Sequence, residues 1–229
     1  MSNAIPIITV DGPGGAGKGT VSLLVANELK WNLLDSGAIY RSLAYYAVQK
    51  EIDLQNEDAL ENFALNLPVK FVKANLDSPY QDIYLDDEMI TTEIRTEEYG
   101  KISSKIAKLP KIREALLTAQ RNFAQLPGLV ADGRDMGTVV FPEAKIKFFL
   151  EASIEERAKR RYMQLKADGL DVNLATIIEE VSLRDKQDRE RVASPMKPAE
   201  GAIIVDTTNI GIEEVFATLM DEIKKVFAV

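Results

Sequence analysis

The sequence predicts an α/β fold in which a mainly parallel sheet is flanked by helices. Three observations predict it. Short apolar runs alternate along the chain with segments whose apolar residues recur at helical spacing, as in parallel sheets covered by helices. A glycine-rich loop joins the first apolar run to the first helical segment. One stretch with partial two-residue alternation and one pair of charged helices interrupt the pattern, so they are predicted to be an antiparallel insertion and a helical lid.

The first half begins with an apolar run that ends at Asp11-Gly12. Its predicted elements are, in order, a strand over residues 5–10, a helix over 18–29, a short strand over 33–34 ending at Asp35, and a helix over 37–50. Between residues 67 and 95, the runs VKFVKA and DIYLDD are separated by NLDSPYQ, which is rich in turn residues and predicts a small antiparallel β insertion. Two helices follow, over about 96–108 and 111–126, broken at Pro110.

The second half returns to the strand and helix alternation. Strands are predicted over 128–131, ending at Asp132, over 144–152 and over 202–206. Ser153, with Glu156 three residues later, predicts a capping box at the start of a helix that carries several basic residues. A second charged helix runs over about 173–192. The last helix has one apolar stripe for packing on the sheet, formed by Ile212, Val215, Phe216, Leu219, Met220, Ile223, Val226 and Phe227.

Composition limits the chemistry. The chain has 229 residues, which suits one α/β domain, and it contains neither Cys nor His. Thiol and histidine nucleophile systems are therefore excluded, and catalysis has to use carboxylates, Lys, Arg, hydroxyls, backbone amides or a metal. The net charge of −8 opposes nucleic-acid binding. No run is long enough to span a bilayer and no signal peptide is visible, so we expect a cytoplasmic protein that binds no membrane.

The glycine-rich loop predicts a phosphate-binding P-loop of the NTPase type, because it lies between a strand and a helix. It consists of Gly12, Pro13, Gly14, Gly15, Ala16, Gly17, Lys18, Gly19 and Thr20. Glycines let backbone N–H groups face one concavity, and Lys18 reaches the β- and γ-phosphates. The usual pattern has Ser or Thr directly after the lysine, but here Gly19 intervenes. We expect Thr20 to hold Mg²⁺ directly or through a water.

A second polar segment follows the second strand. Ser36 is predicted to cap the next helix, and Arg41 lies within its first turns. The carboxyl ends of parallel strands form the ligand crevice of such sheets, so the pair suits an anionic acceptor. The alternative is a capped helix with a solvent-facing arginine.

Together, the motifs DGPGGAGKGT, DSGAIYR and ADGRDMGTVVFP closely resemble those of bacterial cytidylate kinases, which are nucleoside monophosphate kinases. The likeness covers nearly the whole chain. It implies transfer of the γ-phosphoryl group of ATP to CMP or dCMP with Mg²⁺, by a monomer. It also implies one domain over 1–229, with a core of about 1–35, 113–152 and 193–229, an NMP-binding part over about 36–112 and a lid over about 153–192.

The resemblance also implies roles for individual residues. Gly12 to Thr20 match the ATP loop, and Arg157, Arg160 and Arg161 match the lid. The positions that match the acceptor site are Ser36, Arg41, Ser104, Arg113, Arg134, Asp135, Arg184, Asp188 and Arg191. The cations expected to act on the transferred phosphoryl group are Lys18, Arg134, Arg184 and Arg191.

The spacing of the basic residues agrees with this interpretation. Arg184, Asp188 and Arg191 fall at i, i+4 and i+7, so they are predicted to share one helix face. Such a run by itself is more often a solvated, salt-bridged helix. The P-loop in the same chain favours the functional interpretation, because phosphoryl transfer needs several cations around the migrating group.

Two aspartates have sharper predicted roles. Cytosine presents an amino donor where uracil presents an acceptor, so the carboxylate of Asp135 is predicted to select cytosine, with Arg113 donating to the ring. Asp132 ends an apolar strand, as a Mg²⁺-orienting carboxylate does, and the equal alternative is a residue that stabilises the turn after it.

Rival functions remain. Another small-molecule P-loop kinase, for AMP, UMP or shikimate, is the nearest. A GTP-binding switch protein would need an NKxD segment, and none occurs. A non-catalytic nucleotide-binding module has no need for a second anion site.

Overall fold

The computed structural model describes residues 5–72, 81–167 and 169–227. The chain divides into two compact units, one formed by residues 1–33 and 124–229 and the other by residues 34–123. Each unit has hydrophobic clusters of its own. The predicted turn NLDSPYQ lies outside the described residues except for Gln81.

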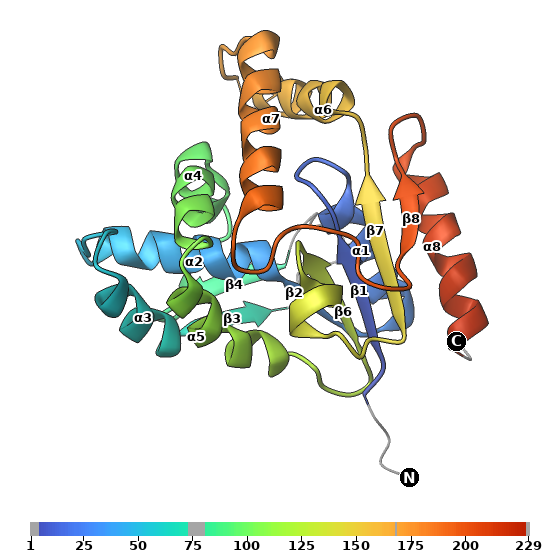
Figure 1. Cartoon of the computed structure of the whole chain (residues 1–229), viewed down its shortest axis with the longest axis horizontal. Coiled ribbons are helices and arrows are strands. Elements are labelled where there is room, and N and C mark those ends of the chain that lie inside the picture. The colour runs from blue at the N-terminus through green and yellow to red at the C-terminus, as the bar shows by residue number, and fades with distance from the viewer. Residues whose placement is uncertain (1–4, 73–80, 168, 228–229) are drawn as a thin grey trace. The chain divides into compact units, whose positions relative to one another are not determined.

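The larger unit is built on a parallel sheet (Figure 1). Its strands are β1 (Ile7–Asp11), β2 (Asn32–Asp35), β6 (Leu129–Gly133), β7 (Ile146–Glu151) and β8 (Ile203–Asp206), in the order β2-β6-β1-β7-β8. β1 pairs in parallel with β6 and β7, and β7 pairs in parallel with β8. The boundary between the units falls within β2, after Leu33. The predicted α/β class is confirmed.

Helices follow the strands of this unit in the predicted order. They are α1 (Lys18–Leu29), α6 (Ile154–Ala167), α7 (Leu174–Glu190) and α8 (Ile212–Val226). α1 and α8 share a core with β1, β6 and β7, in which Val21, Leu219 and Ile8 are fully buried. The predicted stripe of α8 is confirmed at its centre, because Leu219 and Ile223 have no exposed surface. α6 and α7 pack on each other around a small cluster that includes Ile177.

One element of this unit was not predicted. A short π-helix, η2 (Met136–Val140), follows β6 directly. The sequence there, MGTVV, is apolar and β-branched, so its local pattern does not indicate a helix. The partners of its first N–H groups are tertiary and are described with the site.

The smaller unit combines helices with a separate sheet. Its elements are α2 (Ser36–Gln49), α3 (Glu57–Leu65), β3 (Val69–Val72), β4 (Asp82–Leu85), β5 (Glu88–Met89), the 3₁₀-helix η1 (Glu93–Arg95), α4 (Glu97–Ile106) and α5 (Pro110–Arg121). β4 pairs antiparallel with both β3 and β5, which confirms the predicted β insertion. Ile83, Ile90 and Ile94 are buried against Ala38 of α2.

Three predictions on helices in the smaller unit were incomplete. α3 was missed because it buries only Leu60 and Ala64, which is too little periodicity to predict a helix. The predicted break between two helices is present, but Pro110 is the first residue of α5 rather than the residue before it, because the first position of a helix needs no N–H donor. α5 also ends at Arg121 rather than near residue 126.

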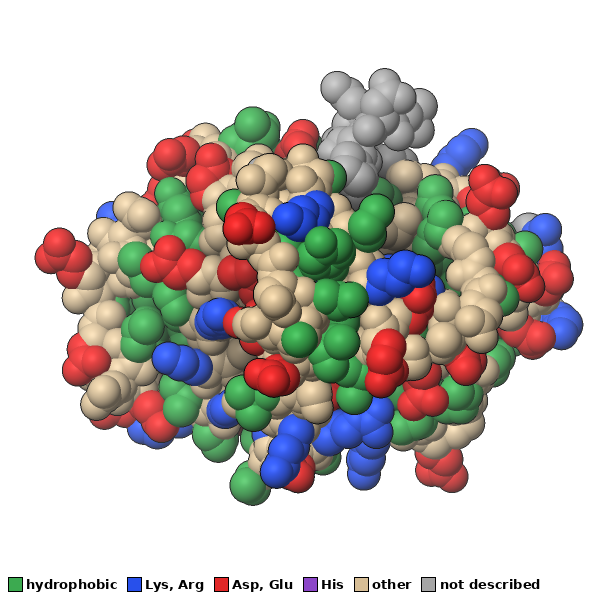
Figure 2. All heavy atoms as spheres, turned by 90° about the horizontal axis from the view of Figure 1, so that it is seen from above, with side chains coloured by type: hydrophobic (Ala, Val, Ile, Leu, Met, Phe, Trp, Pro, Cys, Tyr) green, Lys and Arg blue, Asp and Glu red, His purple; other side chains and the backbone are tan. Residues whose placement is uncertain are grey.

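The surface carries mixed charge. Figure 2 shows acidic and basic side chains interspersed with apolar ones on the face seen from above. Among the helices of the described ranges, none has a stretch long and apolar enough to cross a bilayer.

Candidate active site

The loop between β1 and α1 adopts a conformation that requires glycine. Gly12 has φ +142°, and a Cβ atom there would lie 2.1 Å from the carbonyl oxygen of Leu150 in β7. Gly17, the residue before α1, has φ 85°, and no side chain caps the first turn of this helix. The first N–H groups of an uncapped helix attract anions through their partial positive charge. The predicted strand, loop and helix context of a P-loop is therefore present.

Lys18 lies inside this loop. Its ammonium group donates to the carbonyl oxygen of Pro13 at 2.9 Å and lies 4.0 Å from a carboxylate oxygen of Asp132. Burial, together with the positive charge of Arg134, lowers the pKa of Lys18 to about 8, although Asp132 and Asp11 act in the opposite direction. A buried cation with a lowered pKa gains stability when an anion approaches it.

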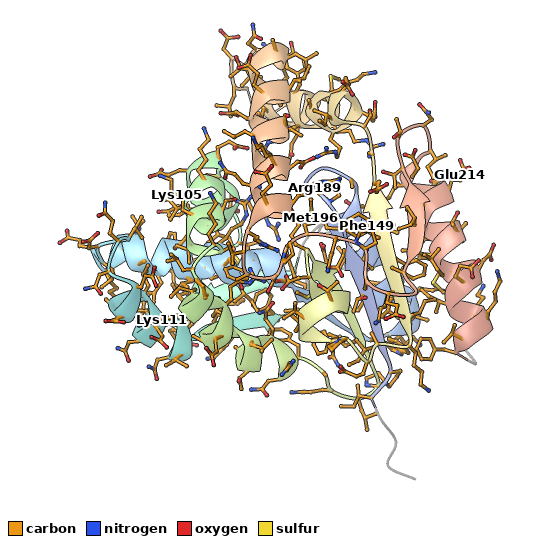
Figure 3. The ribbon with its side chains drawn as sticks, viewed as in Figure 1. Lys105, Lys111, Phe149, Arg189, Met196 and Glu214 are labelled. Atoms are coloured by element: carbon orange, nitrogen blue, oxygen red, sulfur yellow. The ribbon has the colours of Figure 1, made fainter. Side chains whose placement is uncertain are left out.

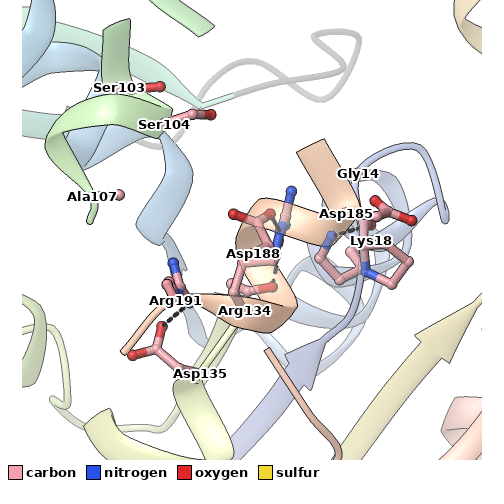
Figure 4. Close-up of polar contacts among 12 residues, drawn as sticks. Gly14, Lys18, Ser103, Ser104, Ala107, Arg134, Asp135, Asp185, Asp188 and Arg191 are labelled. Atoms are coloured by element: carbon pink, nitrogen blue, oxygen red, sulfur yellow. Dashed lines mark hydrogen bonds and ion pairs between the residues drawn. The ribbon is translucent and has the colours of Figure 1, made fainter. Parts of the chain in front are cut away.

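Two arginines lie close enough to Lys18 to affect its charge. Arg134, after β6, donates from Nε to Asp188 of α7 at 3.0 Å (Figure 4). Burial acts to lower the pKa of Arg134, but the carboxylates of Asp188, Asp132 and Asp185 together outweigh it and raise this pKa. Burial and the neighbouring Arg134 lower the pKa of Arg184, whose Nε has no hydrogen-bond partner among the described residues. Three cationic side chains, Lys18, Arg134 and Arg184, therefore lie near the carboxylates of Asp132 and Asp188.

Asp135 and Arg191 form a second buried pair of opposite charges. Both side chains are about 5% exposed or less, and Nη2 of Arg191 lies 3.9 Å from Oδ1 of Asp135 (Figure 4). The prediction that Arg191 shares a helix face with Arg184 and Asp188 was wrong in one respect. α7 ends at Glu190, and Arg191 has the extended backbone angles φ −63° and ψ 140°.

The chain after α7 fixes the end of this helix. Met196 donates its N–H to the carbonyl oxygen of Asp188 at 2.8 Å, and its side chain is buried. Figure 3 labels Met196 where the chain turns back from α7. Nε of Arg191 donates to the carbonyl oxygen of Ser194 at 2.6 Å. Asp188 and Arg191 are therefore held by backbone contacts as well as by their ion pairs.

The lid arginines differ in their surroundings. Arg157 is 2% exposed; it pairs with Asp185 of α7 at 2.5 and 3.0 Å and donates to the carbonyl oxygen of Gly14 at 3.0 Å. Arg160 bonds to Glu156 and to the carbonyl oxygen of Thr207. Arg161 donates to Gln164. Arg157 therefore links the phosphate loop to α7, and its predicted contact with ATP stays a prediction.

The start of α6 shows half of the predicted capping box. The hydroxyl of Ser153 accepts from the N–H of Glu156 at 3.2 Å, as predicted. The N–H of Ser153 donates to the hydroxyl of Thr208 instead of the Glu156 side chain, which binds Arg160. A tertiary partner after β8 replaces the local one.

Oxygen ligands suitable for Mg²⁺ lie at the start of α1. The Asp132 carboxylate, at the end of β6, is 3.4 Å from where a Cβ of Gly19 would lie. Thr20 is exposed in the same helical turn. Among the described residues there is no group of three or more acidic side chains that could hold a metal. Mg²⁺ in phosphoryl-transfer enzymes is held by one or two protein oxygens, water and phosphates, so the residues fit this ion.

Most of the predicted acceptor residues of the smaller unit donate hydrogen bonds to backbone carbonyl oxygens of that unit. Arg41 donates to the carbonyl oxygens of Ile94 and Thr96 at 3.0 Å each, and its guanidinium lies against Gly100. The hydroxyl of Ser104 donates to the carbonyl oxygen of Gly100 at 3.0 Å. Arg41 and Ser104 therefore meet at the start of α4.

Arg113 and Ser36 occupy different places in this unit. Arg113 lies over the ring of Tyr40 and donates to the carbonyl oxygen of Ala107 at 3.1 Å. The predicted capping role of Ser36 was wrong, because Asp35 caps α2 by accepting from the N–H of Ala38. The Ser36 hydroxyl donates instead to Oε1 of Gln120, a buried residue of α5.

Sequence reasoning missed four residues of the site. Thr207 is 1% exposed and donates its hydroxyl to the carbonyl oxygen of Ala16 in the phosphate loop. The other three residues accept buried hydrogen bonds. Asp11 accepts from the N–H of Met136, Gln120 from the hydroxyl of Ser36, and Asp185 from the guanidinium of Arg157. A polar residue at the end of an apolar strand is a usable signal for Asp11 and Thr207, whereas Gln120 and Asp185 lie in charged helices that offer none.

The fold and this site define a P-loop kinase of the nucleoside monophosphate type. A glycine-rich loop holds a buried lysine, and arginines from the segment after β6 and from α7 lie near it. The chain matches the family described as "Cytidylate kinase" over residues 8–225. It is 54% identical to a cytidylate kinase of Pseudomonas paraeruginosa over 220 residues, which cover 96% of each chain. It is 50% identical to that of Shewanella denitrificans over 224 residues, 98% of each. The chain belongs to the cytidylate kinase family.

Proposed function

We propose that this enzyme transfers the γ-phosphoryl group of ATP to CMP or dCMP, forming ADP and CDP or dCDP. The observation that carries the proposal is the group of cations at the phosphate loop, in which Lys18, Arg134 and Arg184 lie close enough to shift one another's pKa values. Like charges are stable together when a polyanion neutralises them. A triphosphate at the loop and the phosphate of a second substrate supply that charge.

The chemistry requires little from the protein beyond position and charge. An oxygen of the CMP phosphate forms a bond to the γ-phosphorus while the bond from that phosphorus to the β,γ-bridging oxygen breaks, leaving ADP. The second pKa of such a phosphate monoester is about 6, so the attacking oxygen is already ionised at neutral pH. The absence of His is therefore no obstacle. Lys18, Arg134 and Arg184 neutralise the charge on the transferred group, as arginine and lysine do in related transfers.

Mg²⁺ would be held by the nucleotide and by Thr20, directly or through a water, and Asp132 would orient it through a water. When bound, the ion supplies further neutralisation of the phosphates. The distance of 4.0 Å between Asp132 and Lys18 supports this assignment, because Lys18 is the first residue of α1 and the carboxylate therefore lies near the start of that helix. Asp132 therefore has two tasks, since it also partly balances the buried charge of Lys18.

We assign acceptor binding to the matched residues of both units: Ser36, Arg41, Ser104, Arg113, Arg134, Asp135, Arg184, Asp188 and Arg191. Arginine suits this task because its planar fork binds phosphate oxygens in pairs. In the unbound protein, Arg41 and Arg113 are occupied by backbone carbonyl oxygens. When CMP binds, these arginines would donate to its phosphate oxygens or to acceptor atoms of its base instead of the carbonyl oxygens. A hydrogen bond from a guanidinium to a charged phosphate oxygen is stronger than one to a carbonyl oxygen.

The test is to incubate the purified protein with ATP, Mg²⁺ and a panel of monophosphates, and to measure diphosphate and ADP together. We expect CMP and dCMP to react best, with UMP slower and AMP slowest. Lys18→Met should lower kcat by more than about 10³-fold, which is the scale of removing a cation that stabilises the transition state. Hydrolysis of ATP without a diphosphate product, or a preference for AMP or shikimate, would contradict the proposal.

A further inference from the structure

The carboxylate of Asp11 connects the phosphate loop to the segment after β6. Asp11 is the last residue of β1, is 2% exposed and directly precedes Gly12. Its Oδ1 accepts from the N–H of Met136 and its Oδ2 from the N–H of Gly137, both at 2.8 Å. These are the first two N–H groups of the π-helix η2, which have no carbonyl partner within the helix.

The close approach of this helix to β1 depends on a glycine. A Cβ at Gly137 would lie 2.8 Å from the hydroxyl oxygen of Thr9 and 3.3 Å from Oδ2 of Asp11. Thr9 and Asp11 are two residues apart on β1 and so face the same side of the sheet. The Thr9 hydroxyl has no hydrogen-bond partner among the described residues, so Asp11 is the side chain of this face that binds the helix.

The residues fixed by these bonds adjoin the substrate-binding side chains. Asp135 immediately precedes Met136, and its carbonyl oxygen accepts from the N–H groups of Val139 and Val140. Its φ of −148° and ψ of 24° belong to no regular element. Arg134 is one residue earlier. The direction of both side chains therefore depends on where the start of η2 lies.

We propose that Asp11 is a positioning residue for the acceptor substrate: by holding the N–H groups of Met136 and Gly137, it sets the orientation of Asp135 and Arg134 relative to the phosphate loop. This inference rests on the proposed function, because it assumes that Asp135 and Arg134 bind the nucleoside monophosphate. It adds a residue that need not touch either substrate.

A carboxylate suits this role better than other side chains. An ionised carboxylate only accepts, so it satisfies two N–H donors at once. An amide at the same position accepts with its oxygen but turns its NH₂ group toward the other N–H. Burial raises the pKa of Asp11 to about 7, and the N–H groups of Gly137 and Met136 oppose this rise. Burying this carboxylate reduces the stability of the fold, so its presence at this position is consistent with a role in positioning the start of η2.

The experiment compares Asp11→Asn with Thr9→Val in the full chain. Thr9→Val is the matched control, because it is isosteric, lies on the same face of β1 and leaves the Asp11 bonds intact. We expect Asp11→Asn to raise the KM for CMP by about tenfold, the equivalent of losing one hydrogen bond to a charged acceptor. The Kd for ATP should change less than about threefold, and the CMP:UMP ratio of kcat/KM should fall, because Asp135 is misaligned. Thr9→Val should change none of these values.

A loss of stability alone would not lower the CMP:UMP ratio, so this readout separates positioning from a structural role. An unchanged ratio and KM in a folded Asp11→Asn enzyme overturns the inference. If that variant does not fold, hydrogen exchange of the wild type decides. Slow exchange of the Met136 and Gly137 amides supports the two bonds to Asp11, and exchange at the rate of an open loop excludes them. A wild type that does not phosphorylate CMP refutes the proposed function instead.

Discussion

At the residue scale, the buried charges of the larger unit come in balanced groups. Arg134 is paired with Asp188, and Lys18 lies near Asp132. Asp188 keeps its negative charge because Arg134, Arg184 and Arg191 together outweigh its burial and lower its pKa. Removing one member of such a group leaves its partner as a buried charge without a counter-charge, which destabilises the protein. Substitutions in this site are therefore best made to isosteric neutral residues.

Asp135→Asn tests the selection of cytosine. A carboxylate can only accept, as from the amino group of cytosine, whereas an amide can also donate and so tolerates the carbonyl of uracil. We expect the CMP:UMP ratio of kcat/KM to fall by about tenfold or more, corresponding to about 1–3 kcal/mol of lost discrimination. Steady-state kinetics with both nucleotides measure it. Asp221→Asn on the exposed part of α8 is the control, and an unchanged ratio in Asp135→Asn would remove Asp135 from this role.

Lys18 predicts proton uptake when ATP binds. Burial and Arg134 lower its pKa to about 8, so near pH 8 about half of the molecules carry a neutral amine. The phosphates of ATP raise this pKa again, and their own second ionisation, near pH 6, is complete at pH 8. Calorimetry in buffers of different ionisation enthalpy should therefore show net proton uptake at pH 8 and much less at pH 6.5. Lys18→Met should abolish it, and uptake that persists in this variant would contradict the assignment.

At the element scale, α7 uses two carboxylates almost one turn apart to contact two different segments. Asp185 binds Arg157 of α6, which in turn reaches Gly14, and Asp188 binds Arg134 after β6. The same helix therefore reaches the P-loop through one ion pair and the segment after β6 through the other. The mostly exposed charged residues of α7 gave no sequence signal that Asp185 is buried.

Asp185→Asn should destabilise the protein strongly. It leaves the buried guanidinium of Arg157 without its counter-charge, a loss that costs about 3–5 kcal/mol for a buried pair. The matched control is Asp171→Asn, which breaks the exposed pair with Lys166 and should have no measurable effect. Urea unfolding at constant m value measures both. Equal midpoints for the two variants would show that the Arg157–Asp185 pair does not stabilise the fold.

At the scale of the whole molecule, two compact units carry the residues assigned to one reaction. Phosphoryl transfer has to exclude water, or ATP is hydrolysed. We expect the 36–112 region and the 153–192 helices to close over ATP and CMP, as lids do in related enzymes. Small-angle scattering should show a smaller radius of gyration with ADP and CDP together than with either alone. No compaction with both ligands would contradict this prediction.

Local sequence patterns were sufficient for the elements that depend on short-range chemistry. Strand, glycine loop and helix followed from residues 5–29, and the alternation around Ile83 predicted the antiparallel insertion. α3 was missed because it buries only Leu60 and Ala64, and η2 was missed because the partner of its first N–H groups is the distant Asp11. The acceptor-site assignments came from the family resemblance, since the spacing of arginines in a helix does not distinguish a substrate site from a solvated face.

By itself, the sequence determined the α/β alternation, the phosphate loop and the supply of arginines without histidine or cysteine. Only the tertiary structure decided which of these polar groups meet. In that structure the Asp11 carboxylate accepts from the N–H groups of Met136 and Gly137. The Ser36 hydroxyl donates to Gln120, and the Arg157 guanidinium donates to the carbonyl oxygen of Gly14. The physical reason is that a buried polar group has to find a partner, and that partner is chosen by packing between segments about 80 to 140 residues apart, which no local pattern records.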